Sequence, residues 1–227
     1  MYGECDKSLG PKAVLTLLHT VAVCVAAWIL FGNGFGVLFH WTGKAAPPDH
    51  ALTHALVFAC AAIYFARICF GTLHLYKRKF SYGEALGVGF YVVFIHILFA
   101  FFGRTNTKPF GWAQFTGIFL YLLGSYLNTG SEYLRYLWKE NPGNGGRLYT
   151  VGLFRFSRHI NYFGDELLFT GYALITGSFW GLIIPALMAF GFVFVNIPML
   201  DGYLKKKYGE QFDAYALRTK KFVPYVY

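Results

Sequence analysis

Charged residues are scarce in this chain. Asp, Glu, Lys and Arg make up 14% of its 227 residues, against about 25% in a typical soluble domain. Hydrophobic residues make up 56%, and several apolar runs approach the roughly 20 residues that cross a bilayer as a helix. The scarcity of charge argues against an ordinary soluble domain and predicts an integral membrane protein built from helices.

Other absences narrow the class further. The sequence shows none of the alternating segments, each about ten residues long, that a membrane β-barrel requires. Its cysteines, Cys5, Cys24, Cys60 and Cys69, form no C-x-x-C pair, so they imply neither a disulfide framework nor a zinc site. No internal repeat or linker marks a second domain. We therefore expect one membrane-embedded domain over residues 1–227.

The apolar runs predict an all-α, polytopic fold with about six transmembrane helices. The first run is too long for the apolar core of a signal peptide and lacks a convincing cleavage site, so we expect it to be retained. Loops are expected at residues 32–50 and 140–151, and an amphipathic helix at residues 201–221. The expected spans are Val14–Phe31, Ala51–Phe70, Ala85–Phe102, a fourth starting near Trp112, Tyr162–Thr176 and Phe179–Asn196.

The basic residues predict the orientation of these spans. Six spans place both termini on one side of the membrane, and every Lys and Arg except Lys44, Arg104 and Lys108 falls on that side. The positive-inside rule then places both termini in the cytosol. Topology and attraction to anionic lipids explain most of the net charge of +9, so basicity alone does not indicate a nucleic-acid partner.

Polar residues interrupt the apolar pattern between residues 128 and 166. A polar stripe that begins inside an apolar segment is tolerated where it lines a protein interior or a wet cavity. Asn161 and Asp165 have i, i+4 spacing at the start of the fifth span. Four more polar residues, spaced i, i+4, i+7 and i+11, share one face of a helix: Asn128, Glu132, Arg135 and Lys139.

Two interpretations of this polar region stay open. In the structural one, its acids pair with Arg135, Arg155 or Arg158 and join the helices. In the functional one, the acids accept hydrogen bonds from ribose hydroxyls or an amide, while nearby basic side chains hold phosphates. Those basic residues are Lys139, Arg147, Arg155 and Arg158.

Residues Gly152–Asp165, with the sequence GLFRFSRHINYFGD, resemble the signature of the steroid 5α-reductase superfamily of integral-membrane enzymes. The sterol C14-reductase branch has a related H-x-N-Y-x-G-D block. Upstream, Asn128–Tyr133 is similar to the N-x-x-S-D-Y of steroid 5α-reductases. The closing Tyr203–Lys205 and the final KKFVPYVY resemble the C-terminus of that superfamily. Ile160 stands where many members have proline, which changes backbone restriction and leaves the polar side chains intact.

This resemblance implies NADPH as the cofactor, no metal, and a cofactor-binding half at residues 111–227. Residues 1–110 would then form the substrate side. The superfamily's substrate-polarising Glu and Tyr have no clean match, and the nearest candidates for catalytic residues are Tyr76 and Glu84. The implied cofactor-binding residues are Asn128, Glu132, Lys139, Arg147, Tyr149, Arg155, Ser157, Arg158, His159, Asn161, Tyr162, Asp165, Tyr203 and Arg218.

The implied function is NADPH-dependent reduction of a C=C bond in a lipophilic substrate, such as a steroid, a sterol or an enone lipid. The substrate would come from the bilayer and the cofactor from the cytosol. A second hypothesis is an S-adenosylmethionine-dependent methyltransferase. Isoprenylcysteine carboxyl and phospholipid methyltransferases share an R-H-P-x-Y-x-G core and a terminal segment similar to Tyr208–Tyr215. A third hypothesis is a non-catalytic sterol-binding membrane protein.

Overall fold

The structure, a computed structural model, describes residues 8–43 and 50–227. Cys5, Lys7 and Lys44 lie outside the described residues, which contain helices and no β-strand. The prediction of an all-α fold is confirmed. The α-helices are α1 (Leu9–Phe31), α2 (Gly34–Phe39), α3 (Ala51–Phe70), α4 (Tyr82–Thr105), α5 (Trp112–Ser125), α6 (Ser131–Glu140), α7 (Ile160–Ile175), α8 (Ile183–Gly191), α9 (Ile197–Tyr208) and α10 (Glu210–Arg218).

Shorter helical segments join several of these helices. The π-helical segments are η2 (Gly71–Leu75), η3 (Tyr126–Gly130) and η7 (Phe192–Asn196). The 3₁₀ segments are η1 (His40–Thr42), η4 (Pro142–Asn144), η5 (Gly152–Arg155) and η6 (Phe179–Leu182). The segment η3 joins α5 directly to α6 and contains Asn128, the first residue of the polar stripe predicted from the sequence. Short π-helical segments inside α-helices are frequent at functional sites.

The chain divides into two compact units. Unit 1 comprises Met1–Phe119 and Thr170–Ile184, and unit 2 comprises Leu120–Phe169 and Pro185–Tyr227. Unit 1 therefore contains α1 to α4, and unit 2 contains α6, α9 and α10. The assignment of residues 1–110 to the substrate and 111–227 to the cofactor stays a prediction.

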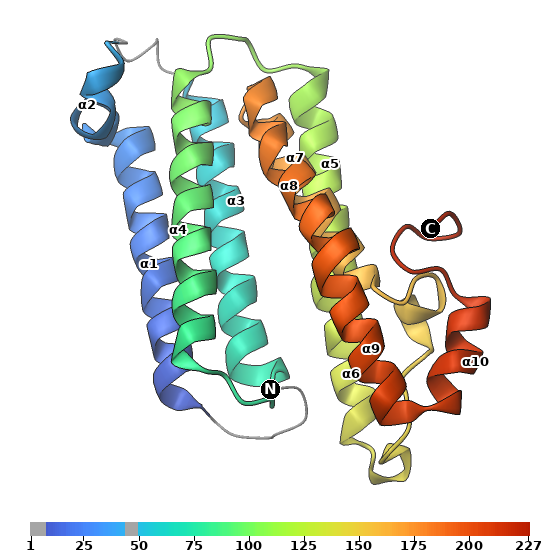
Figure 1. The fold of residues 1–227 in the computed structure, drawn as a ribbon. Helices are drawn as coiled ribbons and strands as arrows, with labels where there is room; N and C mark the ends of the chain where they lie inside the picture. The colour runs from blue at the N-terminus through green and yellow to red at the C-terminus, as the bar shows by residue number, and fades with distance from the viewer. Residues whose placement is uncertain (1–7, 44–49) are drawn as a thin grey trace. The chain divides into compact units, whose positions relative to one another are not determined.

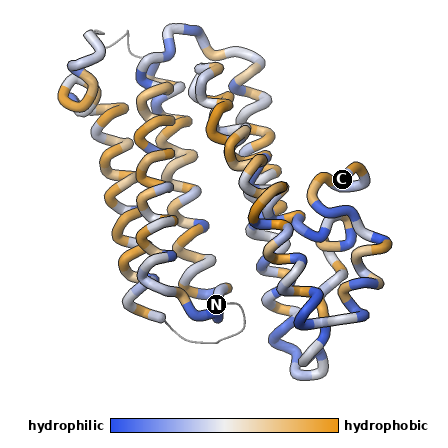
Figure 2. The backbone as a smooth tube through the Cα atoms, in the orientation of Figure 1, coloured by the Kyte–Doolittle hydropathy of each residue, from blue (hydrophilic) through white to orange (hydrophobic). Residues whose placement is uncertain are grey.

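In unit 1, α1, α3 and α4 run side by side (Figure 1) and are apolar along most of their length (Figure 2). The buried face of α1 follows helical spacing, with Leu15, His19, Ala22, Ala26 and Ile29 all at most 3% exposed. Positions at i, i+4, i+7, i+11 and i+14 lie on one side of a helix. This face packs α1 into the bundle.

Within residues 8–43 and 50–227, four stretches are long and apolar enough to cross a membrane by length and composition, and the chain is a membrane protein. They contain the first, second, third and sixth of the expected spans. α5 and α7 are shorter, and α7 includes Asp165 and Glu166. The total of about six spans stays a prediction. The four stretches are Leu9–Phe31, Ala51–Leu75, Tyr82–Thr105 and Phe179–Tyr208.

The segment expected as a loop at residues 32–50 is partly helical, because it contains α2 and η1. Aromatic packing explains the difference. Phe35 is buried, and its ring centroid lies 5.8 Å from that of Phe101. Phe39 lies 4.6 Å from the same ring. These contacts hold the segment against α4, although its glycines favoured a loop.

The tail is also built differently from the single amphipathic helix expected at residues 201–221. α9 continues from the preceding apolar stretch and ends at Tyr208, and α10 starts again at Glu210. Gly209 separates them with a φ of +52°, a conformation that glycine adopts readily. The turn lets α10 bury Phe212 and Tyr215 inside unit 2.

Candidate functional site

A hydrogen-bonded polar cluster joins η3, α6 and the start of α7 in unit 2. The Asn128 side-chain amide donates to the Asn161 carbonyl at 3.1 Å. The Asn161 side-chain amide donates in turn to a Glu132 carboxylate oxygen at 3.0 Å. Glu132 is only 5% exposed and also pairs with Arg135. The structure thus brings together three of the predicted cofactor-binding residues, and it gives Glu132 the ion pair that the structural interpretation expected.

Close helix packing makes this cluster possible. A Cβ atom added to Gly124 would lie 2.4 Å from the Gly164 carbonyl oxygen, and one added to Gly164 would lie 2.5 Å from the Asn128 backbone nitrogen. Backbones approach this closely only where side chains are absent, as in the small-residue interfaces of membrane helices. The two glycines therefore set the distance across which Asn128 reaches Asn161.

A second cluster surrounds the Ser157–Arg158–His159 run. The Ser157 hydroxyl donates to the Phe222 carbonyl at 2.7 Å. Two backbone amides also donate to carbonyls of the C-terminal segment. Arg158 N–H donates to the Lys220 carbonyl at 2.9 Å, and His159 N–H donates to the Lys221 carbonyl at 3.1 Å. This run therefore fastens residues 220–222 to the loop before α7.

The Arg158 side chain makes further hydrogen bonds to the C-terminal residues and to α9. Its Nη1 donates to the carbonyls of Ala216 and Thr219 at 3.1 and 3.0 Å. Its Nη2 lies 2.9 Å from Asp201 Oδ2, and His159 Nε2 lies 2.8 Å from Asp201 Oδ1. Arg158 is 8% exposed, so the guanidinium is mostly committed to protein groups. Its predicted contact with a phosphate stays a prediction.

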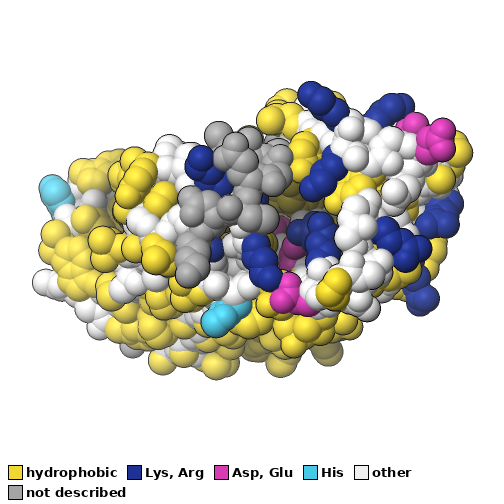
Figure 3. Space-filling view, turned by 90° about the horizontal axis from the view of Figure 1, so that it is seen from below, with side chains coloured by type: hydrophobic (Ala, Val, Ile, Leu, Met, Phe, Trp, Pro, Cys, Tyr) yellow, Lys and Arg dark blue, Asp and Glu magenta, His cyan; other side chains and the backbone are white. Residues whose placement is uncertain are grey.

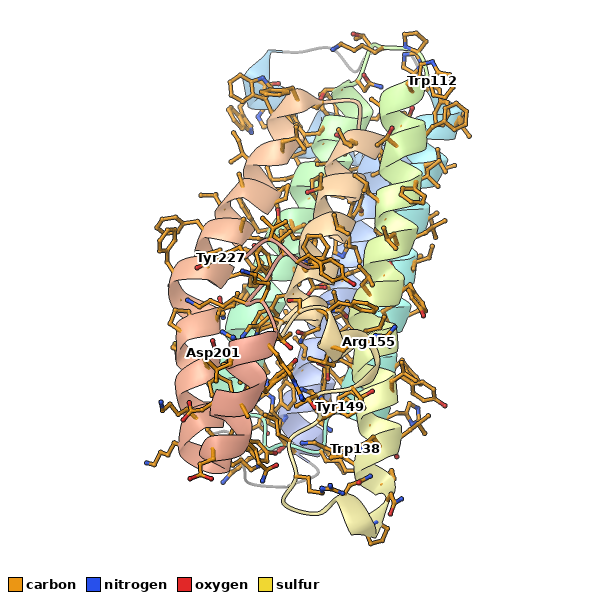
Figure 4. All side chains as sticks on the ribbon, turned by 90° about the vertical axis from the view of Figure 1, so that its right-hand side faces the viewer. Trp112, Trp138, Tyr149, Arg155, Asp201 and Tyr227 are labelled. Atoms are coloured by element: carbon orange, nitrogen blue, oxygen red, sulfur yellow. The ribbon has the colours of Figure 1, made fainter. Side chains whose placement is uncertain are left out.

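Asp201, in α9, is the member of this cluster that was not predicted from the sequence (Figure 4). Its carboxylate holds both Arg158 and His159, so it orients two of the proposed cofactor-binding residues. A signal was present in the sequence, because Asp201 is the one acidic residue between Glu166 and Glu210. Adjacent buried donors at residues 158 and 159 need an acid, and Asp201 lies at the start of the amphipathic helix expected at residues 201–221.

Aromatic rings line both clusters. The His159 ring is stacked on Tyr162 at 5.5 Å, and Tyr162 is stacked on Phe192 of η7 at 4.8 Å. Tyr149 packs between Trp138, at 5.3 Å, and Phe154, at 5.6 Å. Figure 4 shows Trp138 and Tyr149 near each other. The two stacked contacts hold the His159 imidazole between Asp201 and Tyr162.

Two tyrosines of unit 2 stay protonated at neutral pH. Burial raises the pKa of Tyr149 above its ordinary value, while the positive charge of Arg135 acts in the opposite direction. Burial also raises the pKa of Tyr215, whose hydroxyl donates to the Phe154 carbonyl at 2.6 Å. Both hydroxyls can therefore act as hydrogen-bond donors.

The remaining predicted cofactor-binding residues lie nearer to solvent. Arg155 is exposed, and its guanidinium carbon lies 4.5 Å from the Phe156 ring. Arg218 donates to the Thr150 hydroxyl at 3.2 Å. Lys139 and Arg147 are exposed, and Asp165 and Tyr203 are partly buried. Lys and Arg outnumber Asp and Glu on the face shown in Figure 3.

The two candidate catalytic residues belong to unit 1. The Glu84 backbone N–H donates to the Ser81 hydroxyl oxygen at 3.1 Å, and this bond caps the N-terminus of α4. Its carboxylate forms a two-point pair with Arg78, with one contact at 2.9 Å. The Tyr76 carbonyl accepts from Lys12 Nζ at 2.8 Å. Glu84 thus has a structural partner, and the catalytic assignment of both residues stays a prediction.

Comparison with known proteins bears on the part of the chain that contains both clusters. The family model described as "Protein of unknown function (DUF1295)" matches residues 85–219. This match includes the Gly152–Asp165 block and Asp201. The match also includes every predicted cofactor-binding residue. The two candidate catalytic residues, Tyr76 and Glu84, lie just before its first residue.

Curated relatives match the chain over part of their own length. The probable O-methyltransferase ustE of Ustilaginoidea virens is 33% identical over 46% of this chain and 36% of the relative. The Delta(14)-sterol reductase erg24 of Schizosaccharomyces pombe is 28% identical over 69% and 41%. The human 3-oxo-5-alpha-steroid 4-dehydrogenase 2 is 31% identical over 52% and 46%. The chain thus spans less than half the length of each of these relatives, and the matches confirm the resemblance first seen in the motifs.

Proposed function

The chain belongs to the DUF1295 family, and from that premise we propose that it is a membrane-bound, NADPH-dependent reductase of a C=C bond in a lipophilic substrate. Two of the relatives are named as a sterol reductase and a steroid 4-dehydrogenase. The observation that carries the proposal is the hydrogen-bonded cluster of Asn128, Glu132 and Asn161. It concentrates amide and carboxylate groups in a chain that has few of them.

The donor set of unit 2 fits a dinucleotide. Arg147 and Arg155 are exposed, and neither forms an ion pair with another described residue. Both guanidinium groups can therefore contact phosphates, for which their planar fork is well suited. His159 Nδ1 and Arg158 Nε are buried and have no hydrogen-bond partner among the described residues. Buried polar atoms of this kind call for a partner.

Each polar group has a proposed role around the cofactor. Asn128, Glu132 and Asn161 bind the nicotinamide or ribose end, and Lys139, Arg147 and Arg155 meet the phosphates. When bound, NADPH supplies the hydride. Ser157, Arg158 and His159 act in this scheme by holding the C-terminal segment, which includes Tyr215 and Arg218, beside the loop before α7.

Tyr149, Tyr162, Asp165 and Tyr203 are proposed to line the cofactor. On the substrate side, the Tyr76 hydroxyl is proposed to donate a hydrogen bond to a carbonyl of the substrate, with Glu84 as the acid that supports it. A hydroxyl donor stabilises the negative charge that develops on such an oxygen during reduction.

The location follows from the same proposal. We infer about six spans, with both termini and the cofactor site facing the cytosol, from the excess of Lys and Arg on that side. A site at the membrane boundary receives a lipophilic steroid, sterol or enone lipid from the bilayer and a charged cofactor from water. The bilayer and the lipid substrate are then the proposed partners, and nucleic acid is not one.

A methyltransferase is the second candidate, and one observation favours it specifically. The relative named as a probable O-methyltransferase has the highest identity of the three compared here, 33%. In that function, the same cluster would bind S-adenosylmethionine, which has no phosphate groups. Arg147 and Arg155 would then contribute little to affinity.

Isotope transfer distinguishes the two functions. The purified full chain is incubated with bilayer lipids that include enone sterols, together with NADPH deuterated at the nicotinamide C4 position. The proposal predicts reduced products that carry deuterium from the cofactor, detected by mass spectrometry. Methylated products that form with S-adenosylmethionine instead would overturn it. Sterol binding without either product would point to the non-catalytic hypothesis.

A matched pair of variants tests the cluster in the same assay. Glu132→Gln keeps the side-chain size and removes the buried carboxylate, and we expect a large loss of product. Glu210→Gln removes an exposed carboxylate in the first turn of α10, and we expect unchanged product. Equal activity of the two variants would show that the cluster does not serve the reaction.

A further inference from the structure

The last turn of α10 and the chain's final residues enclose a cleft in unit 2. Its volume is about 300 Å³, and its lining combines two kinds of side chain. Arg158, Arg218, Lys220 and Lys221 are basic, while Leu217 and Tyr227 are apolar or aromatic. Figure 4 shows Tyr227 in the segment that follows α10. No role proposed above uses this combination.

Three of the four basic side chains of the cleft pair with no Asp or Glu among the described residues. Arg218, Lys220 and Lys221 are exposed, and none of them forms an ion pair with a described residue. The nearby Asp201 is shared by Arg158 and His159. Arg158 is 92% buried, and its Nε has no hydrogen-bond partner among the described residues. Four basic side chains on one small cleft attract an anion.

Exposed apolar side chains adjoin the same cations. Leu217 is 90% exposed, Tyr225 is 76% exposed and Val226 is 72% exposed. Lys221 Nζ lies 5.5 Å from the centroid of the Tyr227 ring. Basic residues alternating with exposed Leu, Val and Tyr are typical of protein surfaces that lie at the headgroup level of a membrane. A soluble anion would leave these apolar side chains in water.

We propose that this cleft binds the phosphate of an anionic phospholipid, while Leu217, Tyr225 and Val226 enter the boundary between headgroups and acyl chains. Arg218, Lys220 and Lys221 supply the charge, and the cleft admits the phosphate beside the Arg158 guanidinium. The lipid holds the C-terminal segment against the membrane surface. This inference does not depend on the proposed reductase activity.

The test measures lipid binding by the full chain in a neutral detergent. Dioleoylphosphatidylglycerol is titrated into mixed micelles, bound lipid is counted by native mass spectrometry, and dioleoylphosphatidylcholine serves as the zwitterionic control. We expect tighter binding of the anionic lipid. Lys220→Gln/Lys221→Gln should weaken it by about 25-fold, since each basic residue near an anionic surface contributes roughly a fivefold factor. Leu217→Ser should weaken it further.

A charge-matched control variant keeps the test specific. Lys205→Gln/Lys206→Gln removes two exposed lysines of α9 that do not line the cleft, and we expect binding close to wild type. Lys220→Arg/Lys221→Arg keeps both positive charges, so this variant should bind the anionic lipid as the wild type does. Circular dichroism on all variants checks that the helices are intact.

Three results would overturn the proposal. The first is equal affinity for both lipids. The second is equal weakening by the cleft variant and the α9 variant, which would mean unspecific charge attraction. The third is displacement of the lipid by inorganic phosphate or NADPH at comparable concentration, which would make the cleft a site for a free anion or for a phosphate of the cofactor. Failure of the isotope-transfer assay would leave all three readouts unaffected.

Discussion

The two units of this protein keep polar groups inside in different ways. In the helices of unit 1, buried polar side chains make hydrogen bonds between neutral groups. His19 Nδ1 lies 2.9 Å from the Leu15 oxygen, and the Tyr172 hydroxyl donates to the Val57 carbonyl at 3.0 Å and lies 3.4 Å from His96 Nδ1. In unit 2, the Arg158 side chain alone makes three hydrogen bonds, two to carbonyls and one to the Asp201 carboxylate. Isolated hydrogen bonds are compatible with simple packing of an apolar bundle. A network of charged groups is costly to bury, and this contrast supports our proposal that the cofactor site lies in unit 2.

Removal of Arg158 should produce the largest effect. Arg158→Ala removes the donor to two carbonyls and to Asp201 Oδ2, while His159 still contacts Asp201 Oδ1. Loss of one partner of a buried pair typically costs about 3–5 kcal/mol. Unfolding in mixed micelles should show this loss, and protease should cut the C-terminal segment faster. If Arg158→Ala lowered the free energy of unfolding by no more than the loss of one hydrogen bond does, the two units would not differ in how they stabilise buried polar groups.

The second-largest loss of stability is expected from a methyl group added where α5 and α7 pack closely. Gly124→Ala places a methyl group 2.4 Å from backbone atoms of Gly164 and Leu168, and overpacking of this kind costs about 1–3 kcal/mol. The matched control is Gly87→Ala in α4, where no atom lies within 4 Å of the added Cβ. In the same unfolding measurement the control should cause no loss and should stabilise the protein by up to about 1 kcal/mol, because alanine favours a helix more than glycine does. Similar losses in both variants would show that the close approach is not needed.

Removal of a neutral hydroxyl from unit 1 should matter less. Tyr172→Phe removes the donor to the Val57 carbonyl and a longer contact, 3.4 Å, with His96 Nδ1. We expect a loss of about 1 kcal/mol in the free energy of unfolding. The ring remains, and its packing at 4.3 Å from Phe99 is retained. A loss as large as that of Arg158→Ala would mean that unit 1 contains a polar network of equal weight.

The smallest effect is expected at the surface of unit 2. Lys205 lies 3.1 Å from Asp213, and both side chains are more than half exposed. Solvent screens such pairs, so Lys205→Gln should change the free energy of unfolding by less than about 0.5 kcal/mol. A larger change would mean that exposed charges, as well as buried ones, stabilise unit 2.

Much of the fold could be predicted from the sequence because apolar runs of membrane length are nearly sufficient to define helices. The expected end of the first span at Phe31 and the start of the second at Ala51 agree with α1 and α3. The helix at Gly34–Phe39 could not be predicted, because it depends on contacts of Phe35 and Phe39 with Phe101, far away in sequence.

The candidate site was predicted in part for a similar reason. The i, i+4 pattern located Asn128 and Glu132, and the motif located Asn161, so their cluster could be anticipated. Periodicity carries no information about which acid pairs with a given base across 40 residues. The link from Arg158 and His159 to Asp201 therefore needed the three-dimensional structure.

Ligand-induced stabilisation tests the central claim most directly. The claim is that unit 2 binds NADPH, and a ligand at 100 times its dissociation constant adds about 2.7 kcal/mol to the stability of the folded state. We predict that NADPH raises the melting temperature of the purified full chain by several degrees, that S-adenosylmethionine does not, and that Glu132→Gln loses the rise while Glu210→Gln keeps it. A rise with S-adenosylmethionine and none with NADPH would contradict the account.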